Sequence, residues 1–98
     1  MAYSPSAPEV RLQFAKRLRQ LRIKRGFHRA RVFADALGIE ENRYTRYERA
    51  EVEPSLTLIY RICQTMGVSP NELLGFTDDG RNATAAEPAK PTGNAGLE

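Results

Sequence analysis

The sequence predicts an all-α protein: one compact domain of five short helices over residues 9–75, with flexible segments over residues 1–8 and 76–98. Apolar residues recur at spacings of three and four, which places them on one face of each predicted helix. Serine or glycine stands at most of the predicted helix ends. The two flanking segments show no apolar periodicity and are rich in small residues and proline, so they bury too little apolar surface to fold.

The first helix is predicted over residues 9–25. Val10, Phe14, Leu18 and Leu21 form its apolar stripe, and Gly26 ends it. Ninety-eight residues allow one small domain, so this stripe is expected to face a core shared with the other helices.

The second helix is predicted within residues 27–37. Its apolar face consists of Ala30, Phe33, Ala34 and Leu37, at the i, i+3, i+4, i+7 spacing of a helix. Arginines at positions 29 and 31 oppose the dipole of this helix at its N-terminus. Either they are solvated, or they surround a phosphate that docks on the helix N-terminus.

The third helix is predicted over residues 41–49, after a turn at Gly38 and with Glu40 as its cap. Tyr44 and Tyr47 share one face and are expected to pack inward. The opposite face carries side chains that can reach bases and phosphates: Asn42, Arg43, Thr45, Arg46 and Arg49. This helix is therefore the first candidate for a functional element.

The fourth helix is predicted over residues 56–66, between the cap Ser55 and Gly67. Its predicted core stripe is Ile59, Ile62, Cys63 and Met66. A short fifth helix begins at Ser69-Pro70, where Glu72 completes a capping box, and it ends at Gly75.

Charge and composition narrow the function. Residues 9–75 carry thirteen Lys or Arg against eight Asp or Glu, whereas residues 76–98 carry two against four, so the folded part suits a polyanion. A single histidine, His28, and a single cysteine, Cys63, make neither a metal site nor an internal disulfide, which favours a cytoplasmic protein. No apolar run approaches the length of a membrane span, and the N-terminus lacks a basic segment followed by a hydrophobic core, so we expect neither a membrane span nor a signal peptide. The sequence has no phosphate-binding glycine loop, paired carboxylates or nucleophile motif, so we expect no cofactor and no enzyme activity.

The joint spacing of several short motifs resembles the phage-repressor and Cro-like (XRE-type) helix-turn-helix family. The motifs are Leu21-Arg22, Gly26, Phe33-Ala34, Leu37-Gly38-Ile39, Tyr47-Glu48-Arg49, Pro54-Ser55, Ile62-Cys63, Met66-Gly67-Val68-Ser69 and Leu73-Leu74. The resemblance implies a lambda-repressor-like fold that rests its second helix on the DNA backbone and inserts its third into the major groove. It assigns base reading to Glu41, Asn42, Thr45 and Arg46, and phosphate contacts to Arg29, Ala30, Arg31, Arg43, Arg49 and Ser55.

The chemistry of the base-reading candidates agrees with that assignment. Arg46 can present a fork to guanine N7 and O6, and Asn42 can do the same to adenine N6 and N7. Thr45 can touch a thymine methyl group or a phosphate. Glu41 can either accept from cytosine N4 or only stabilise the helix dipole.

The resemblance also implies two structural features. Arg22 and Glu48 match an ion pair of the family that fixes the third helix against the first. Dimerisation near the fifth helix would explain the exposed apolar patch that is expected of Val52, Leu58, Tyr60, Leu74 and Phe76. Ala50 stands where the family usually has glycine, so either it adopts a left-handed conformation or the third helix runs one residue further.

Together these observations predict a sequence-specific, double-stranded DNA-binding transcriptional regulator, more specifically a repressor. It is expected to bind an inverted-repeat operator as a homodimer. The alternative is an antitoxin or adaptor that uses the same domain but works mainly by holding a protein partner. A dedicated partner-binding extension would show apolar periodicity, and residues 76–98 show none.

Overall fold

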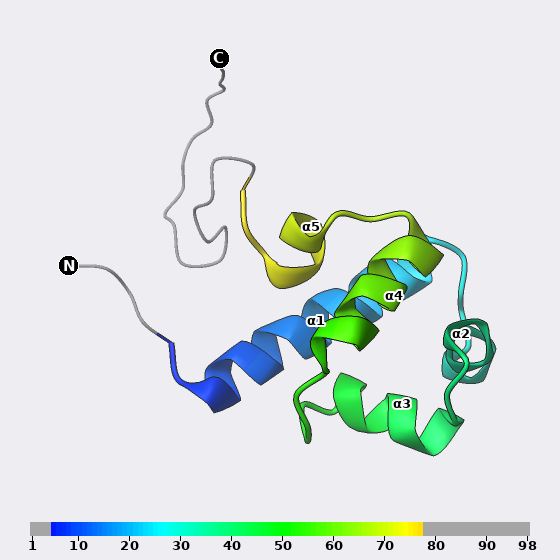
Figure 1. Ribbon diagram of the computed structural model, residues 1–98, viewed down its shortest axis with the longest axis horizontal. Coiled ribbons are helices and arrows are strands. Elements are labelled where there is room, and N and C mark those ends of the chain that lie inside the picture. Colours follow the sequence, from blue (N-terminus) through cyan, green and yellow to red (C-terminus); the bar gives the residue numbers. More distant parts are fainter. Residues whose placement is uncertain (1–4, 78–98) are drawn as a thin grey trace, which may run out of the picture.

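The computed structural model describes residues 5–77, which form five helices as predicted (Figure 1). They are α1 (Ala7–Lys24), α2 (Ala30–Leu37), α3 (Glu41–Glu48), α4 (Leu56–Met66) and α5 (Pro70–Leu74). The predictions for residues 1–4 and 78–98 lie outside the described part of the chain.

The start of α1 differs from the prediction, which placed residues 6–8 in a flexible arm. Ser6 is the N-cap, and α1 begins at Ala7. The Ser6 hydroxyl accepts from the Glu9 backbone N–H (3.3 Å), while the Glu9 carboxylate accepts from the Ser6 backbone N–H (2.8 Å). This reciprocal capping box satisfies two amides that the first turn of a helix leaves unpaired, so the helix extends two residues further back.

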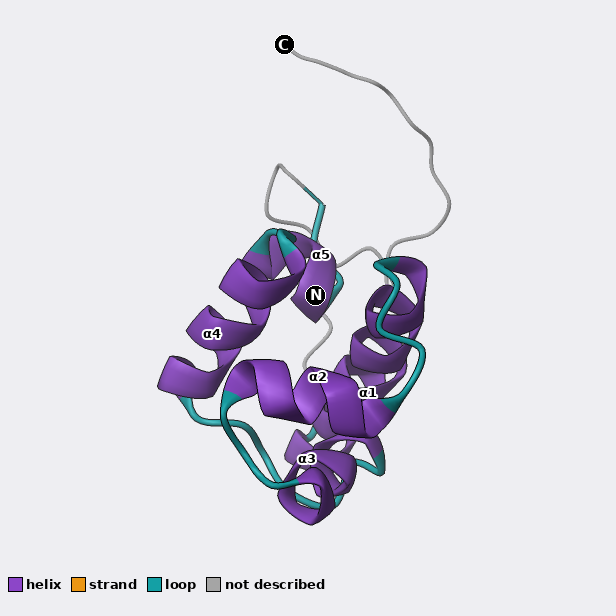
Figure 2. Cartoon of the chain, turned by 90° about the vertical axis from the view of Figure 1, so that its right-hand side faces the viewer, coloured by secondary structure: helices purple, strands orange, loops and turns teal. Residues whose placement is uncertain are grey.

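The helices are arranged so that α2 and α3 lie at one end of the domain and α5 at the other (Figures 1 and 2). The long helix α1 packs against both α3 and α5, and α4 packs against α2 and α5. Helices α2 and α3 pack against each other. The pair α2–α3 is therefore supported from behind by α1 and α4, and one side of it stays at the surface.

The core contains one buried cluster with contributions from all five helices, including Phe14, Leu18, Phe33, Tyr44 and Ile62. Two sequence predictions about it were wrong. Val10 is 43% exposed, because it lies in the first turn of α1 at the edge of the packed helices. Leu58 is only 5% exposed, so it belongs to the core and not to a surface patch.

Cys63 is half-buried and packs against the core cluster. Burial raises the pKa of its thiol, so the protonated, unreactive form is favoured at neutral pH.

Helix α5 is held on α1 by two polar side chains. The Arg17 Nε donates to the Glu72 carbonyl oxygen (2.6 Å), and the Gln13 side-chain amide donates to the Leu74 carbonyl oxygen (3.2 Å). A Cβ atom at Gly75 would approach Gln13 to 2.6 Å, and Gly75 has a positive φ of 82°. Glycine is required here because the chain passes close to α1 in a left-handed conformation.

Replacing Arg17 by alanine is expected to lower the free energy of unfolding by about 1–2 kcal/mol, because a carbonyl group loses its charged donor. Urea denaturation followed by circular dichroism measures this change. The control is Lys16→Ala, which removes an exposed neighbouring charge on α1 and should leave the urea midpoint nearly unchanged. Equal destabilisation by both variants would contradict a specific role for Arg17.

Candidate nucleic-acid interface

A tight turn joins α2 to α3 and sets their mutual orientation. Gly38 has a φ of 79°, and its N–H donates to the Asp35 carbonyl oxygen (3.1 Å). The N–H of Ile39 donates to the Ala34 carbonyl oxygen (3.0 Å). Behind the turn, the rings of Phe33 and Tyr44 meet edge to face with centroids 5.4 Å apart. This aromatic contact locks the buried face of α3 onto α2.

The outward face of α3 carries most of the predicted base-reading side chains. Glu41, Asn42 and Arg46 are exposed, while Thr45 is half-buried. The Thr45 hydroxyl donates to the Asn42 carbonyl oxygen (3.1 Å), which leaves its methyl group for an apolar contact. Since both tyrosines of α3 are buried, this short helix has one face in the core and the other at the surface.

The predicted phosphate-contacting residues lie at the start of α2, on and directly after α3, and at the start of α4. Arg29, Arg31, Arg43, Arg49 and Ser55 are exposed, and Ala30 is half-buried. Arg29 is the N-cap of α2 and makes no capping hydrogen bond through its side chain. The Ser55 hydroxyl accepts from the Leu58 N–H (3.1 Å), so its proton is available to donate to a phosphate. This group offers one hydroxyl and four guanidinium groups, all of them donors that suit an anionic backbone.

A buried ionic network ties α3 to α1. The Arg22 Nε donates to Glu48 Oε2 (2.6 Å), and the Arg22 side chain also donates to the Phe27 carbonyl oxygen (2.7 Å). The Tyr44 hydroxyl donates to the same carboxylate. The side chains of Arg22 and Glu48 are 5% and 11% exposed, so the pair is largely shielded from water. The network fixes the position of α3 along α1.

The network shifts two pKa values. Burial by itself would lower the pKa of Arg22, but the hydrogen bond to Glu48 and the carboxylate charge outweigh burial, and the pKa lies above its usual value. Burial raises the pKa of Tyr44 far above 10.0, and the hydrogen bond to Glu48 and its negative charge add to this effect. Both groups therefore keep their protons throughout the physiological pH range.

The raised pKa of Tyr44 makes stability depend on pH in alkaline solution. The stabilisation is complete below pH 10.0, and the free energy of unfolding should fall above it, because the unfolded chain then releases a proton that folded Tyr44 retains. Urea denaturation at increasing pH measures this fall, which should be smaller in Tyr44→Phe. Spectrophotometric titration of the two folded proteins should show the same phenolate absorbance in the wild type and in Tyr44→Phe, because folded Tyr44 keeps its proton. A larger phenolate absorbance in the wild type would show that folded Tyr44 ionises, and would contradict its raised pKa.

The end of α3 is a left-handed turn. Ala50 has a φ of 60°, its N–H donates to the Tyr47 carbonyl oxygen (3.1 Å), and the Glu51 N–H donates to the Arg46 carbonyl oxygen (3.0 Å). Of the two conformations considered for Ala50, the structure therefore adopts the left-handed one, although a side chain there is unfavourable by about 1–2 kcal/mol. The Arg11 Nε donates to the Ala50 carbonyl oxygen (3.3 Å), which helps to hold this turn against α1.

Sequence reasoning missed Glu51 and Arg11. The Glu51 carboxylate pairs with the side chains of Arg46 and Arg49. The spacings of five and two residues are not the three or four that bring side chains together on a helix. Only the left-handed turn at Ala50 brings Glu51 back beside α3, and the sequence left that turn undecided.

The predicted dimerisation patch is only partly exposed. Leu58 is buried, and Val52 and Leu74 are half-buried and pack against the core. Tyr60 is 64% exposed and Phe76 is 40% exposed. Leu56, which the prediction omitted, is 83% exposed and lies four residues before Tyr60 on the same helix, α4.

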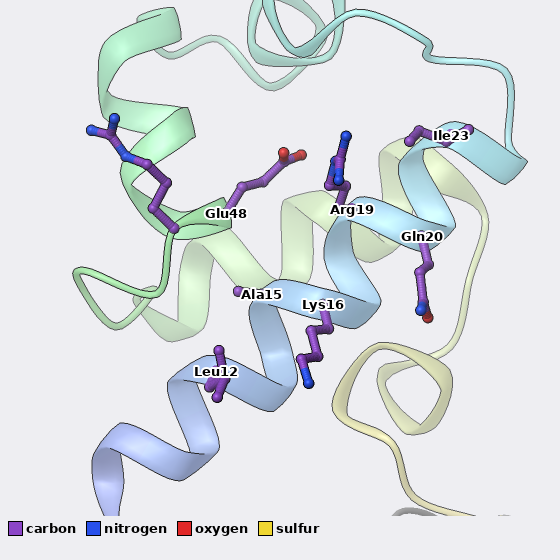
Figure 3. Close-up of a pocket in the computed structure, with 8 residues that line it drawn as sticks. Leu12, Ala15, Lys16, Arg19, Gln20, Ile23 and Glu48 are labelled. Carbon is purple, nitrogen blue, oxygen red and sulfur yellow. The ribbon is translucent and has the colours of Figure 1, made fainter.

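A shallow groove of about 340 Å³ runs between α1 and the end of α3 (Figure 3). Its lining includes Leu12, Lys16, Arg19 and Ile23 of α1, together with Glu48. Among the residues that line the groove, Glu48 supplies the one carboxylate, and Arg22 binds it. The lining therefore does not contain the carboxylate pair that acid–base chemistry commonly uses. Within residues 5–77, no group of three His, Cys, Asp or Glu side chains could hold a metal ion, and no helix is long and apolar enough to cross a bilayer.

Comparison with known proteins identifies the fold and its relatives. A family model described as a helix-turn-helix domain matches residues 13–77. The chain is 36% identical over 64 residues to the uncharacterized HTH-type transcriptional regulator YonR, derived from the SPbeta prophage of Bacillus subtilis (strain 168). The match covers 65% of this chain and 58% of that relative, so the chain spans less than two thirds of the relative's length.

Two solved structures share the fold. The restriction-modification controller protein C.AhdI from Aeromonas hydrophila is 25% identical, with a TM-score of 0.64 over 70% of this chain and 99% of that chain. The hypothetical transcription factor NHTF from Neisseria is 23% identical, with a TM-score of 0.63 over 76% of this chain and 84% of that chain. These relatives are named as regulators or as a transcription factor, and none as an enzyme.

Proposed function

Because the chain belongs to the helix-turn-helix domain family, whose model matches residues 13–77, we propose that it binds specific sequences of double-stranded DNA and regulates transcription. The five helices form a lambda-repressor-like fold of the kind in which the third helix enters the major groove. The prophage relative is named as a transcriptional regulator, which supports the same role for this chain. We favour repression, as the resemblance to phage repressors implies.

The single observation that carries this proposal is the division of α3 into two faces. Tyr44 and Tyr47 are buried, whereas Asn42 and Arg46 on the opposite face are exposed. The buried Glu48 carboxylate anchors the same helix to α1. A rigidly held helix with an amide and a guanidinium facing outward has the side chains that read adenine and guanine edges.

Around this helix, the exposed arginines and Ser55 are assigned to the DNA backbone. The N-terminus of α2 offers backbone amides, including that of Ala30, between the arginines at positions 29 and 31. An anion docked there would satisfy these amides and offset the unfavourable charges beside them. Such contacts orient the domain on the duplex and carry no sequence information directly.

We extend the proposal to a homodimer on an inverted repeat. The exposed Leu56 and Tyr60 of α4, together with Phe76 after α5, are large apolar side chains that a second copy could cover. On an inverted repeat whose half-sites lie one helical turn apart, roughly 34 Å, the third helices of the two copies would enter successive major grooves.

Selection of bound duplexes from a random DNA pool tests both parts of the proposal. A palindromic consensus with half-sites about 10 base pairs apart is expected if the protein binds as a dimer. A single, non-repeated half-site would contradict dimerisation only. Recovery of no enriched sequence would contradict the proposed function, and a stoichiometric protein partner that co-purifies would then favour the adaptor or antitoxin alternative. Lys16→Ala, an exposed α1 variant, serves as the control that should select the same consensus.

A further inference from the structure

One carboxylate lies between two arginines of the proposed DNA-binding surface. Glu51 Oε2 is 3.0 Å from the Arg49 Nε, and Glu51 Oε1 is 3.5 Å from the Arg46 Nε. Each carboxylate oxygen is therefore assigned to a different guanidinium. A negative charge next to proposed DNA contacts opposes general DNA affinity, so its position calls for a physical explanation.

The backbone brings Glu51 to this position. The Schellman turn after α3 pairs the Glu51 N–H with the Arg46 carbonyl oxygen (3.0 Å) and keeps Ala50 left-handed. The Arg11 Nε holds the Ala50 carbonyl oxygen (3.3 Å) and thereby attaches the turn to α1. The main chain at Glu51 is thus fixed relative to Arg46, even though the side chains themselves are exposed.

The contact to Arg46 has a specific geometry. A guanidinium carries one N–H at Nε and two NH₂ groups at its end. The carboxylate lies at Nε of Arg46, which leaves the two terminal groups available for a fork to guanine N7 and O6. The charge attraction at Nε favours orientations of the guanidinium in which its two terminal groups face away from Glu51, and it thereby reduces the orientational freedom that Arg46 would lose on binding a base.

We propose that Glu51 is a positioning residue that increases sequence discrimination at the expense of general DNA affinity. On a cognate site, Arg46 binds the base and keeps its contact with Glu51. On other sequences, Arg46 turns to a phosphate and leaves Glu51, whose carboxylate then keeps only its contact with Arg49 and is less well neutralised beside the DNA backbone. This inference rests on the proposed function and adds to it a residue, Glu51, that increases the sequence specificity of Arg46.

A simpler explanation, that the Glu51 carboxylate only repels DNA, predicts a different result. Glu51 is 44% exposed, and exposed ion pairs are weak. If the carboxylate only repelled DNA, removing it would strengthen binding to all sequences by the same factor. The ratio of affinities for the selected site and for random duplex therefore separates the two explanations.

The test compares Glu51→Gln with Glu53→Gln. Glu53 is an exposed acid two residues further on and pairs with Arg11 at 3.9 Å, so Glu53→Gln matches the charge change without removing the partner of Arg46 or Arg49. We expect the affinity ratio to fall about three- to tenfold in Glu51→Gln, as part of the discrimination that a bidentate arginine provides is lost. The ratio should stay unchanged in Glu53→Gln, and Glu51→Gln should have no effect on it in an Arg46→Ala background.

A measurement without DNA tests the contact itself. The Nε–H resonances of Arg46 and Arg49 should move in Glu51→Gln and stay in place in Glu53→Gln, as seen in proton–nitrogen correlation spectra of the arginine side chains. An unchanged affinity ratio in Glu51→Gln, or the same fall in the Arg46→Ala background, would overturn the inference and leave the proposed function intact. A wild-type protein with no preference among duplexes would instead overturn the proposed function, and this inference with it.

Discussion

Replacing Glu48 by alanine is expected to lower the free energy of unfolding by about 3–5 kcal/mol, because the change strands a buried guanidinium. The Arg22 side chain is 5% exposed and would keep only its bond to the Phe27 carbonyl oxygen. The Tyr44 hydroxyl would also lose its acceptor. Chemical denaturation at neutral pH, followed by circular dichroism, measures the effect.

The loss of stability expected in Glu48→Ala is large enough to bring the domain close to unfolding, so a milder variant and a control are needed. Small domains are stable by about 5–15 kcal/mol, so Glu48→Ala can approach complete unfolding. Glu48→Gln retains an acceptor for Tyr44 and should lie between alanine and the wild type. The control is Glu53→Ala, which removes an exposed ion pair and should change stability by less than about 1 kcal/mol. Similar losses at positions 48 and 53 would contradict the structural role assigned to the Arg22–Glu48 pair.

Replacing Arg46 by alanine is expected to weaken binding to the selected DNA site by about 1–3 kcal/mol and to relax the preference at one base pair. The physical reason is the loss of a bidentate contact to a guanine edge, which only the matching base pair supplies. Binding measured against duplexes with each base pair substituted in turn shows both effects. Retention of the full wild-type sequence preference by Arg46→Ala would contradict the proposed placement of α3.

Arg43→Ala is the matched control for Arg46→Ala. Both residues are exposed arginines of α3, but Arg43 is assigned to a phosphate. Its loss should weaken binding to all sequences alike and reduce the slope of log affinity against log salt by about 0.9. If Arg43→Ala relaxed the sequence preference and Arg46→Ala left it unchanged, the roles assigned to the two arginines would have to be exchanged.

The positions of the helices were predictable because local chemistry specifies them. Ser55 and Ser69 accept hydrogen bonds from the first turns of α4 and α5, and Gly67 and Gly75 adopt the left-handed conformation that ends these helices. Such caps involve residues three to five positions apart, so sequence spacing is sufficient to recognise them. The N-terminus of α1 lies two residues before the predicted start, because Ser6 and Glu9 form a capping box there.

Burial was harder to predict than helix position. A periodic stripe gives the direction of the core only approximately, and the neighbouring helices decide which residues of the stripe are covered. Val10 lies on the predicted stripe of α1 but remains 43% exposed at its edge, whereas Leu58 lies beside the predicted stripe of α4 and is buried. The predicted dimerisation patch accordingly loses Leu58, while Leu56 joins the exposed apolar side chains of α4.

Hydrogen bonds and apolar periodicity within single segments specify the all-α class, the order of the five helices and the division of α3 into an apolar and a polar face, so the amino-acid pattern is sufficient to predict them. The conformation of Ala50 and the contacts of Glu51, in contrast, follow from the way the folded segments meet. These depend on Arg11, which is 39 residues away from Ala50 along the chain, and on a turn that reverses the chain after α3. Interactions between distant segments leave no periodic signal, so the contacts around the arginines of α3 emerge only once the chain is folded.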